Sequence, residues 1–491
     1  MQQYGVASFD HGLSLLDGWF PLALQGLVAV LLLVAVGRRT ARRPGRVGLV
    51  VVLGALGALA AWLSFRGSGL ASDPAPLLLW VWVGATVAAV VVVVVGWRGA
   101  RWWRRGLSVL VVPLCVVCVA LVLNQWVGYV TTVQEGWAEA TAGALPDQVD
   151  PSALAGLAGT GASMTTGKVV AMTTPSTGSG FAHRQEYVWL PPAYFDAGPR
   201  PALPAIMMIA GEFNTPADWM RIGDAVPAAD QYARTHGGSA PILVFVDAGG
   251  TFNNDTECVD GPRGNAADHL TRDVVPYVES TFGASRDPRA WGVVGWSMGG
   301  TCAVDLAVMH PELFDTFDDI AGDAGPEVGT KEQTIARLYG GDAAAWARFD
   351  PATVLAGHAP YADTAGWFDD SSDGPQTGRP GGARPGGRPP GARPGGNGGS
   401  GGGGYGAGGY AGGGRNGGAT SGIGGRGGGG ETGQELPQAR ALCAQAGTKG
   451  ITCTVRTQPG RHSWQFADTA FGLALPWMAA RLATPGTPPA V

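Results

Sequence analysis

The segment Gly295-Trp296-Ser297-Met298-Gly299 has the spacing G-x-S-x-G, and its surroundings decide the fold. An apolar run, Ala290 to Val294, precedes it, and a stretch of small residues typical of a helix follows from Gly299. A strand, a sharp turn and a helix in this order expose a serine hydroxyl above the edge of a sheet. The context therefore predicts that Ser297 is a nucleophile.

The spacing alone is a weak signal. A chain with 81 glycines contains roughly one G-x-S-x-G by chance. A second match, Gly398 to Gly402 with Ser400 at its centre, lies in a glycine-rich tract that has no strand pattern before it and no helix pattern after it. Only at the first match do the glycines have a packing reason to be small. A structural turn serine is the weaker alternative for Ser297.

Further apolar runs on both sides of the motif predict a mostly parallel sheet with helices on both faces. Short continuous apolar runs separated by helical patterns are typical of strands that are buried on both faces. Their order indicates a doubly wound α/β domain. The expected strands are Lys168 to Met172, Gln185 to Leu190, Ala205 to Ala210, Ile242 to Val246, Phe317 to Ala321 and Gly450 to Arg456, and the clearest helices are 266–282, 299–309 and 464–482.

The first 127 residues have the composition of a membrane region. Four apolar stretches approach the roughly 20 residues that a transmembrane helix needs: Trp19 to Val36, Val47 to Phe65, Leu77 to Gly96 and Leu107 to Val127. Arginines cluster in the first and third connections, while the second holds only Arg66 and the N-terminal tail holds none. Because cytoplasmic loops retain positive charge, both ends of this region are expected to face outward. The sequence thus predicts a multi-pass protein of the cell membrane with an extracytoplasmic soluble part.

Charge is distributed unevenly between these parts. The first 128 residues hold ten Lys and Arg against three Asp and Glu, and the remainder holds 23 against 35, for a net charge of -5. No basic tract is interleaved with aromatic residues, so nucleic acid is not an expected partner. The apolar stretches contain no Asp, Glu or Lys, which argues against transport through them.

Cysteine usage agrees with an oxidising compartment. An even number of cysteines, Cys258, Cys302, Cys443 and Cys453, falls in the outward part. Four cysteines allow three pairings. Cys443 and Cys453 flank a turn-like segment, which favours that pair and, by remainder, Cys258 with Cys302. Cys115 and Cys118 lie inside the fourth apolar stretch and are expected to be small buried residues of a membrane helix rather than a redox or metal site.

Composition divides the chain into four regions. Residues 1–127 form the membrane region and 128–163 a juxtamembrane connector. Residues 164–373 and 434–484 form the α/β domain. Between its two parts, residues 374–433 are so rich in Gly, Pro and Arg that they cannot bury enough surface to offset ordering entropy. This tract is expected to be a disordered insertion, a solvated spacer in preference to a segment that binds an anionic polymer or a membrane surface.

A serine nucleophile needs a base within hydrogen-bond reach and an acid that orients the base. In α/β-hydrolases these follow in the order serine, acid, histidine. His462 lies in a loop between the last expected strand and the last helix, so it is the predicted base, with a surface histidine as the alternative. The predicted acid is Asp373, at the far end of the segment 367–374, where a strand is expected to give way to a loop. Asp370 is the second candidate for the acid, and Asp369 is also a candidate. The alternative is that all three aspartates are solvated residues of a loop.

Catalysis of acyl transfer also needs backbone donors for an oxyanion. The residue after the nucleophile, Met298, is expected to supply the first. The turn after the strand 205–210 is expected to supply the second, from Glu212 or Phe213. Glu212 is alternatively a polar contact to substrate.

Four segments, in this order, resemble the esterase D family, which includes the antigen 85 type mycolyltransferases of actinobacteria. They are 187–192, 268–282, 295–300 and 459–462. The resemblance covers roughly Lys168 to Ala483 without the glycine-rich tract. It implies an α/β-hydrolase fold, no metal or other cofactor, and an acyl-serine intermediate on Ser297 with His462 as base. The chain departs from the family in having no glycine close before Asp373 and in the long insertion that follows.

Three functions are compatible with these features. The first is a membrane-anchored extracytoplasmic serine esterase that acts on acyl esters, including lipid esters. The second is an acyltransferase of the same chemistry, which passes the acyl group to a sugar of the cell envelope and would contact that glycan. The third is a non-catalytic envelope protein whose α/β domain is a binding module.

Overall fold

The computed structural model describes twelve segments of the chain. They are residues 13–41, 44–68, 75–97, 101–127, 129–130, 132–134, 136–137, 145–157, 164–196, 202–372, 435–460 and 462–482. The tract 374–433 that the sequence predicts to be a disordered insertion lies outside them, as do residues 138–144 and 158–163 of the connector 128–163.

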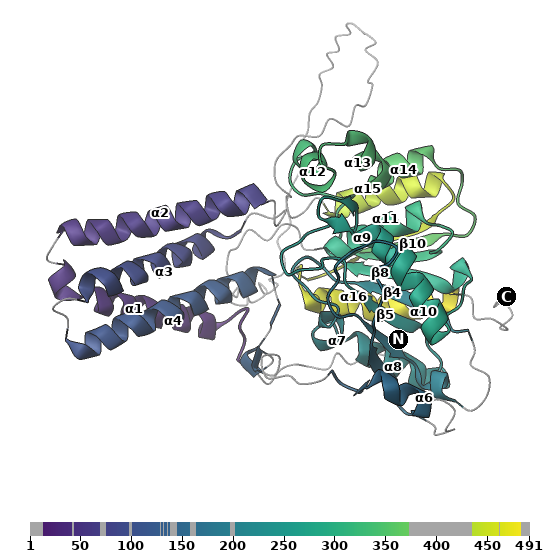
Figure 1. Cartoon of the computed structure of the whole chain (residues 1–491), viewed down its shortest axis with the longest axis horizontal. Helices are drawn as coiled ribbons and strands as arrows, with labels where there is room; N and C mark the ends of the chain where they lie inside the picture. Colours follow the sequence, from purple (N-terminus) through teal and green to yellow (C-terminus); the bar gives the residue numbers. More distant parts are fainter. Residues whose placement is uncertain are drawn as a thin grey trace, which may run out of the picture. The chain divides into compact units, whose positions relative to one another are not determined.

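Four helices are long and apolar enough to cross a membrane, as the sequence predicted. They are α1 (Trp19–Ala41), α2 (Pro44–Ser68), α3 (Leu77–Gly96) and α4 (Trp102–Val127) (Figure 1). Helices α2 and α3 touch where small residues face each other, since a Cβ on Gly54 would lie 2.9 Å from the carbonyl oxygen of Gly84. Cys115 and Cys118 are fully buried in the apolar contact between α1, α3 and α4, as expected of small packing residues.

The α/β domain is built on a nine-stranded sheet in the order β1-β2-β3-β5-β4-β8-β9-β10-β11. Strand β3 is antiparallel to its neighbours β2 and β5, and every other pair is parallel. The mostly parallel sheet is therefore confirmed. The strands are β1 (Gln148–Val149), β2 (Lys168–Ala171), β3 (Tyr187–Leu190), β4 (Ala205–Ile209), β5 (Ile242–Val246), β8 (Trp291–Trp296), β9 (Thr316–Ile320), β10 (Ala365–Ser371) and β11 (Thr452–Gln458), and a separate hairpin pairs β6 (Asp260–Gly261) with β7 (Gly264–Asn265).

Helices cover both faces of this sheet (Figure 1). The longer ones are α8 (Ala225–Thr235), α10 (Val275–Phe282), α11 (Met298–Met309), α12 (Lys331–Leu338), α15 (Glu435–Thr448) and α16 (Trp464–Arg481). The shorter ones are η1 (Pro151–Ala153), α6 (Leu154–Leu157), η2 (Pro192–Phe195), α7 (Asp218–Arg221), α9 (Ala266–Asp268), η3 (His269–Val274), η4 (Pro288–Ala290), α13 (Ala343–Phe349) and α14 (Pro351–Gly357).

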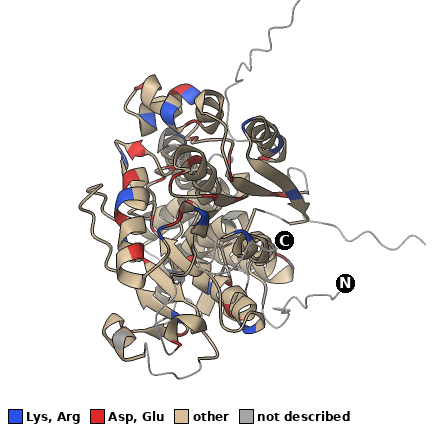
Figure 2. Cartoon of the chain, turned by 90° about the vertical axis from the view of Figure 1, so that its right-hand side faces the viewer, with Lys and Arg blue, Asp and Glu red and all other residues tan. Residues whose placement is uncertain are grey.

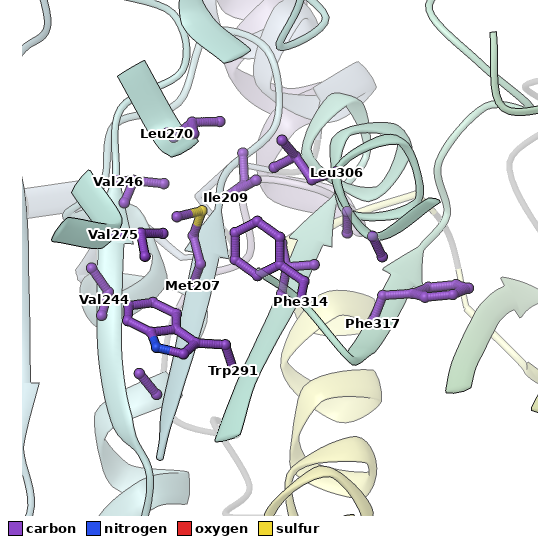
Figure 3. Packing of buried hydrophobic residues seen from close by; sticks show 14 of the residues in the cluster. Met207, Ile209, Val244, Val246, Leu270, Val275, Trp291, Leu306, Phe314 and Phe317 are labelled. Atoms are coloured by element: carbon purple, nitrogen blue, oxygen red, sulfur yellow. The ribbon is translucent and has the colours of Figure 1, made fainter. Parts of the chain in front are cut away.

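Two apolar cores lie on opposite faces of the sheet because side chains alternate along each strand. On β4, Met207 and Ile209 join the core that includes α10, α11 and α15 (Figure 3). Ile206 and Met208 of the same strand join the other core, with α8 and α16. All four are completely buried, which explains why β4 is apolar throughout rather than alternating.

The expected helix over 266–282 differs from the structure in its first half. Residues Ala266–Asp268 are α-helical, His269–Val274 form a wider π-helical turn, and the α-helix resumes at Val275. The cause is Pro276, which has no N–H to donate and whose ring would clash with a carbonyl oxygen one turn earlier. A local π turn relieves that clash without ending the helix.

Lys and Arg are spread singly among Asp and Glu over the described part of the α/β domain (Figure 2). No basic face gathers in that view.

Candidate active site

Ser297 occupies a strained turn between β8 and α11. Its backbone has φ 58° and ψ -122°, a region that residues with a side chain rarely adopt. The neighbouring glycines make the turn possible: a Cβ on Gly295 would lie 1.6 Å from the carbonyl oxygen of Gly299, and one on Gly299 would lie 2.2 Å from that of Ile209. The turn is thus the sharp strand-to-helix elbow that lifts a serine hydroxyl clear of the sheet.

His462 lies beside that hydroxyl although it is 165 residues away in sequence. Its Nε2 atom is 2.9 Å from Oγ of Ser297, within hydrogen-bond distance. The loop after β11 delivers the ring, which packs against the indole of Trp296 with a centroid distance of 4.2 Å. The structure therefore brings together the two residues that the sequence predicted as nucleophile and base.

The environment of His462 favours its neutral form. Burial disfavours a charged imidazolium and lowers the pKa of His462 to about 4, from an ordinary value of 6.5. The side chain keeps 36% of its surface exposed, which limits the shift. A neutral ring is the state that can accept a proton from the serine hydroxyl.

We expect this shift to appear in the pH dependence of hydrolysis. Because the folded pKa lies below 6.5, the base stays unprotonated as pH falls from 8, and kcat/KM should decline only between pH 6 and pH 4. The measurement is kcat/KM for a p-nitrophenyl ester, followed at the isosbestic wavelength of the product so that its own ionisation does not enter. An acidic limb centred at pH 6.5 or above would contradict the low pKa.

The predicted acid, Asp373, lies outside the described residues, and its two rivals on β10 make no described contact with His462. Oδ2 of Asp369 is 3.7 Å from Nη1 of Arg456, and burial raises the pKa of Asp369 to about 6. Both carboxylate oxygens of Asp370 are buried without a hydrogen-bond partner, and burial raises its pKa to about 7. Neither group forms a hydrogen bond or an ion pair with the imidazole among the described residues.

Sequence reasoning missed Glu435, the first residue of α15. Its Oε1 atom is 3.7 Å from Nδ1 of His462, and that nitrogen has no hydrogen-bond partner among the described residues. The distance exceeds a hydrogen bond, and the two groups would form an ion pair only when the imidazole is protonated. Catalytic contacts are often long without substrate and shorten when it binds. A signal was available in the sequence, because Glu435 also satisfies the order serine, acid, histidine.

The turn after β4 passes directly against the nucleophile. A Cβ on Gly211 would lie 3.1 Å from Cβ of Ser297 and 3.1 Å from the carbonyl oxygen of Trp296. Glu212, Phe213 and Met298 all line one small cavity there, of about 10 Å³, which is room for about one water-sized group. The predicted oxyanion donors therefore meet at one place, although the structure does not single out Glu212 or Phe213.

Glu212 is buried in an acidic neighbourhood. Burial, reinforced by the carboxylate of Asp255 and opposed by Arg263, raises the pKa of Glu212 to about 9. Its Oε1 atom is buried and has no hydrogen-bond partner among the described residues. At neutral pH the side chain is therefore a neutral carboxylic acid, which can donate as well as accept a hydrogen bond.

Two disulfides hold the elements that carry the site. Cys258 is joined to Cys302, which ties the loop after β5 to α11 one turn after Ser297. Cys443 is joined to Cys453, which ties α15 to β11. The second pair links the helix that begins at Glu435 to the strand that precedes the His462 loop. These are the pairings that the sequence favoured.

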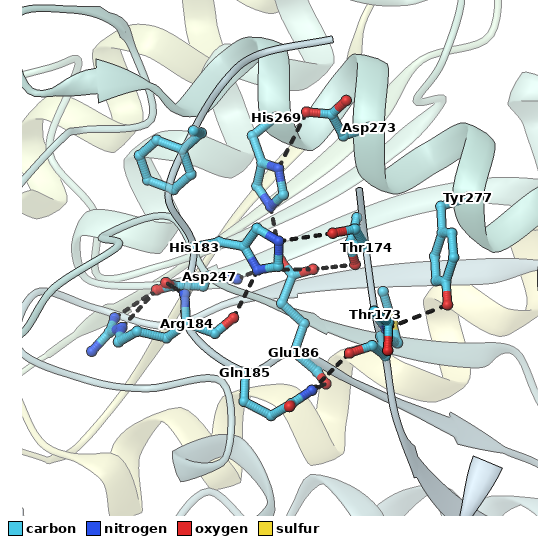
Figure 4. Close-up of polar contacts among 12 residues, drawn as sticks. Thr173, Thr174, His183, Arg184, Gln185, Glu186, Asp247, His269, Asp273 and Tyr277 are labelled. Carbon is cyan, nitrogen blue, oxygen red and sulfur yellow. Dashed lines mark hydrogen bonds and ion pairs between the residues drawn. The ribbon is translucent and has the colours of Figure 1, made fainter. Parts of the chain in front are cut away.

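A buried polar network surrounds Glu186 and reaches the cavity through Arg184 and Asp247 (Figure 4). Glu186 accepts hydrogen bonds from the hydroxyl of Thr174 at 2.5 Å and from the backbone N–H of Asp247 at 3.0 Å, and its Oε1 is 3.1 Å from Nε2 of His269. The ring of His183 stacks on that of His269 at 4.6 Å. These groups join the start of β3, the end of β5 and the π turn.

This network has three side chains close enough to hold a metal ion, His183, Glu186 and His269. The two ring nitrogens of His183, however, lie 2.7 and 3.0 Å from the carbonyl oxygens of Arg184 and Thr174. Burial lowers the pKa of His183, but the Glu186 carboxylate and the two carbonyl groups outweigh it, so the pKa is raised. A ring that donates from both nitrogens has no lone pair for a metal, and the cluster fits a structural network better.

Comparison with known proteins relates the part of the chain that contains Ser297 to esterases. Residues 182–365 match the model of the Esterase family. An uncharacterised protein of Corynebacterium glutamicum is 36% identical over 186 residues, which cover 38% of this chain and 43% of that protein. The chain thus spans less than half the length of this relative. The expected resemblance to an esterase family is confirmed over the matched residues.

Solved structures are similar at lower identity. A ferulic acid esterase is 16% identical with a TM-score of 0.43, covering 65% of this chain and 99% of that one. The S-formylglutathione hydrolase of Agrobacterium tumefaciens is 16% identical with a TM-score of 0.44, over 65% and 97%. MPT51 of Mycobacterium tuberculosis is 14% identical with a TM-score of 0.36, over 64% and 98%. All three TM-scores lie below 0.5, so these similarities do not indicate a function.

Proposed function

We propose that the protein is a serine esterase that hydrolyses acyl esters through an acyl-serine intermediate. The observation that carries the proposal is the 2.9 Å contact between Ser297 Oγ and His462 Nε2 at a strained elbow. A serine hydroxyl is a weak nucleophile until an adjacent base accepts its proton. The match of residues 182–365 to an esterase family supports the same chemistry.

The reaction has two halves. Ser297 Oγ attacks the ester carbonyl carbon while His462 Nε2 takes the hydroxyl proton, and the carbonyl oxygen becomes an oxyanion. The backbone N–H of Met298 and one from the 211–214 turn stabilise that charge. The tetrahedral intermediate then collapses, the alcohol leaves with the proton from His462, and an acyl-serine remains. Water then attacks the acyl carbon while His462 Nε2 takes one of its protons. The bond between that carbon and Ser297 Oγ breaks, the proton passes from His462 to Oγ, and the carboxylic acid leaves.

We assign the orienting role to Glu435. A carboxylate near Nδ1 fixes the tautomer that leaves Nε2 free to accept a proton, and it stabilises the imidazolium that forms. Glu435 Oε1 is the carboxylate oxygen paired with that nitrogen among the described residues. The disulfide between Cys443 and Cys453 supports the assignment, because it couples the helix of Glu435 to the strand before His462.

We further propose that helices α1 to α4 anchor the enzyme in the cell membrane with the α/β domain outside the cytoplasm. The arginines between the first and second helices and between the third and fourth support this orientation. Both disulfides of the α/β domain support an oxidising compartment.

A fluorophosphonate probe tests the proposed nucleophile in the full-length protein in detergent. An activated serine oxygen displaces fluoride from phosphorus and forms a stable phosphonyl ester, while its proton passes to the base. We expect the wild-type protein to gain the mass of one phosphonyl group on the peptide that contains Ser297, and Ser297→Ala to gain none. The matched control is Ser400→Ala, at the second G-x-S-x-G, which should label as the wild type does. Equal labelling of Ser297→Ala and wild type would overturn the proposal.

A further inference from the structure

Asn214, in the turn after β4, is held rigidly by its backbone. Its N–H donates to the carbonyl oxygen of Gly211 at 3.2 Å, and its own carbonyl oxygen accepts from Nη2 of Arg184 at 2.7 Å. The residue is therefore fixed in the turn that passes against Ser297. Neither of these backbone contacts uses the side-chain amide.

The arginine that clamps this turn is itself immobilised (Figure 4). Nη2 and Nε of Arg184 lie 2.6 and 3.1 Å from Oδ1 of Asp247, and the backbone N–H of Arg184 donates to Oδ2 at 2.6 Å. Asp247 is fully buried and its N–H donates to Glu186. Asp247 therefore holds the Arg184 guanidinium in place, and the guanidinium in turn holds the backbone carbonyl group of Asn214.

The side chain of Asn214 is a buried donor without a partner. The residue is 5% exposed, and its Nδ2 atom makes no hydrogen bond to any described residue. Buried side-chain amides are nearly always hydrogen-bonded, so the Nδ2–H of Asn214 is available to an acceptor that enters the cavity. Asn214 lines the same 10 Å³ cavity as Glu212 and Met298.

That amide also lies next to the nucleophile. Oδ1 of Asn214 and Cβ of Ser297 are 3.3 and 3.1 Å from the same point, the position that a Cβ of Gly211 would take. The amide group of Asn214 and the side chain of Ser297 thus both lie within van der Waals reach of this one position. The cavity accommodates one water-sized group, which matches a single oxygen atom of a substrate.

We propose that the Asn214 side-chain amide is a further oxyanion donor, whose Nδ2–H bonds the ester carbonyl oxygen as it acquires charge. This inference rests on the proposed esterase function. A donor that is already desolvated, on a residue whose backbone is already held, needs little reorganisation when the charge develops, so its contribution grows from ground state to transition state. The oxyanion donors predicted from the sequence are all backbone N–H groups. Asn214 adds a side-chain donor, which a substitution can remove.

The test compares Asn214→Ala and Asn214→Asp with wild type in the full-length protein in detergent. Removal of one side-chain oxyanion donor lowers kcat by roughly 10² to 10³ in a serine hydrolase, and we expect about 10² here with KM changed less than threefold. Asn214→Asp keeps the shape of the side chain and replaces the donor by an acceptor, so it should lose at least as much. The substrate is a p-nitrophenyl ester.

A second readout separates a catalytic from a structural role. An alkyl trifluoromethyl ketone forms a hemiketal with the serine hydroxyl, and its oxygen stands where the oxyanion would be. Its inhibition constant should rise by about the same factor as kcat/KM falls, because both report binding of that charge. The matched control is Asn265→Ala, whose amide already donates to the carbonyl oxygen of Ser179 at 2.9 Å. It should leave both constants within threefold of wild type.

The possible outcomes are distinct. If wild type hydrolyses the ester through Ser297 and both Asn214 variants keep kcat and the inhibition constant within threefold, the role of Asn214 is refuted while the esterase function stands. If wild type neither hydrolyses esters nor reacts with the fluorophosphonate, the esterase function itself fails. An Asn214 variant that loses kcat but binds the ketone as wild type does would also refute the donor.

Discussion

Replacing Ser297 by alanine should lower kcat/KM for a p-nitrophenyl ester by at least about 10⁴ in the full-length protein. The reason is that no other described hydroxyl is placed at 2.9 Å from His462 at a turn of this kind. Removing the nucleophile of a serine hydrolase leaves only the stabilisation from the oxyanion donors and from substrate binding. Initial rates at several substrate concentrations, corrected for hydrolysis without protein, provide the measurement.

A double variant makes this prediction sharper. His462 acts as a base only when there is a serine proton to accept. The rate of the double variant Ser297→Ala, His462→Ala should therefore lie within about threefold of the rate of Ser297→Ala alone. His462→Ala alone should be nearly as slow as the double variant. Ser400→Ala is the control for the substitution itself and should hydrolyse the ester at the wild-type rate. Independent, multiplying losses from the two residues would show that they do not act as a unit.

The proximity of Ser297 and His462, the proposed nucleophile and base, was predictable from sequence because each residue lies in a recognisable local pattern. The elbow around Ser297 requires glycines at fixed positions, and the structure shows why, since a Cβ on Gly295 or Gly299 would collide with backbone. His462 was recognisable because only one loop follows the last strand and precedes the last helix. Both residues were identified without any knowledge of which side chains touch.

The acid could not be identified in the same way. Its position depends on where the chain re-enters the domain after about 60 residues of Gly, Pro and Arg, and no local pattern marks that point. The sequence pattern predicts the acid just after the end of β10, where the chain leaves the sheet. The described carboxylate nearest the imidazole instead begins α15, where the chain returns. The contact between His462 and Glu435 depends on the tertiary structure, and no sequence pattern on either side of the insertion predicts it.

The polar network around Glu186 could not be predicted from the sequence for a related reason. Glu186, Asp247 and His269 each lie at the end of a different element, and nothing in their spacing predicts that they share hydrogen bonds. His183 and His269 had no supporting context in the sequence. The role of Asn214 likewise depends on which of its atoms is left without a partner once the chain is folded. The pattern of buried strands fixes the sheet, but it does not specify polar contacts at its edge.

The proposed role of Glu435 leads to the second large effect. Glu435→Gln keeps the size of the side chain but removes its charge, and we expect kcat to fall by about 10³. Substituting the orienting acid by its amide in a serine protease costs about 10⁴, through the wrong tautomer of the histidine, and a starting distance of 3.7 Å argues for a somewhat smaller loss. KM should change little, because the interaction strengthens only when the imidazolium forms.

The other carboxylates provide the comparison that decides between assignments. Asp370→Asn and Asp373→Asn should each retain kcat within about tenfold of wild type, since Asp370 makes no described contact with the ring and Asp373 is not required if Glu435 orients it. Fluorophosphonate labelling of each variant shows whether the nucleophile is still presented. Glu435→Gln should label much more slowly than the two Asn variants. A larger loss of kcat in Asp373→Asn than in Glu435→Gln would return the orienting role to the end of β10, and the 3.7 Å contact of Glu435 would then be a surface ion pair of little energetic consequence.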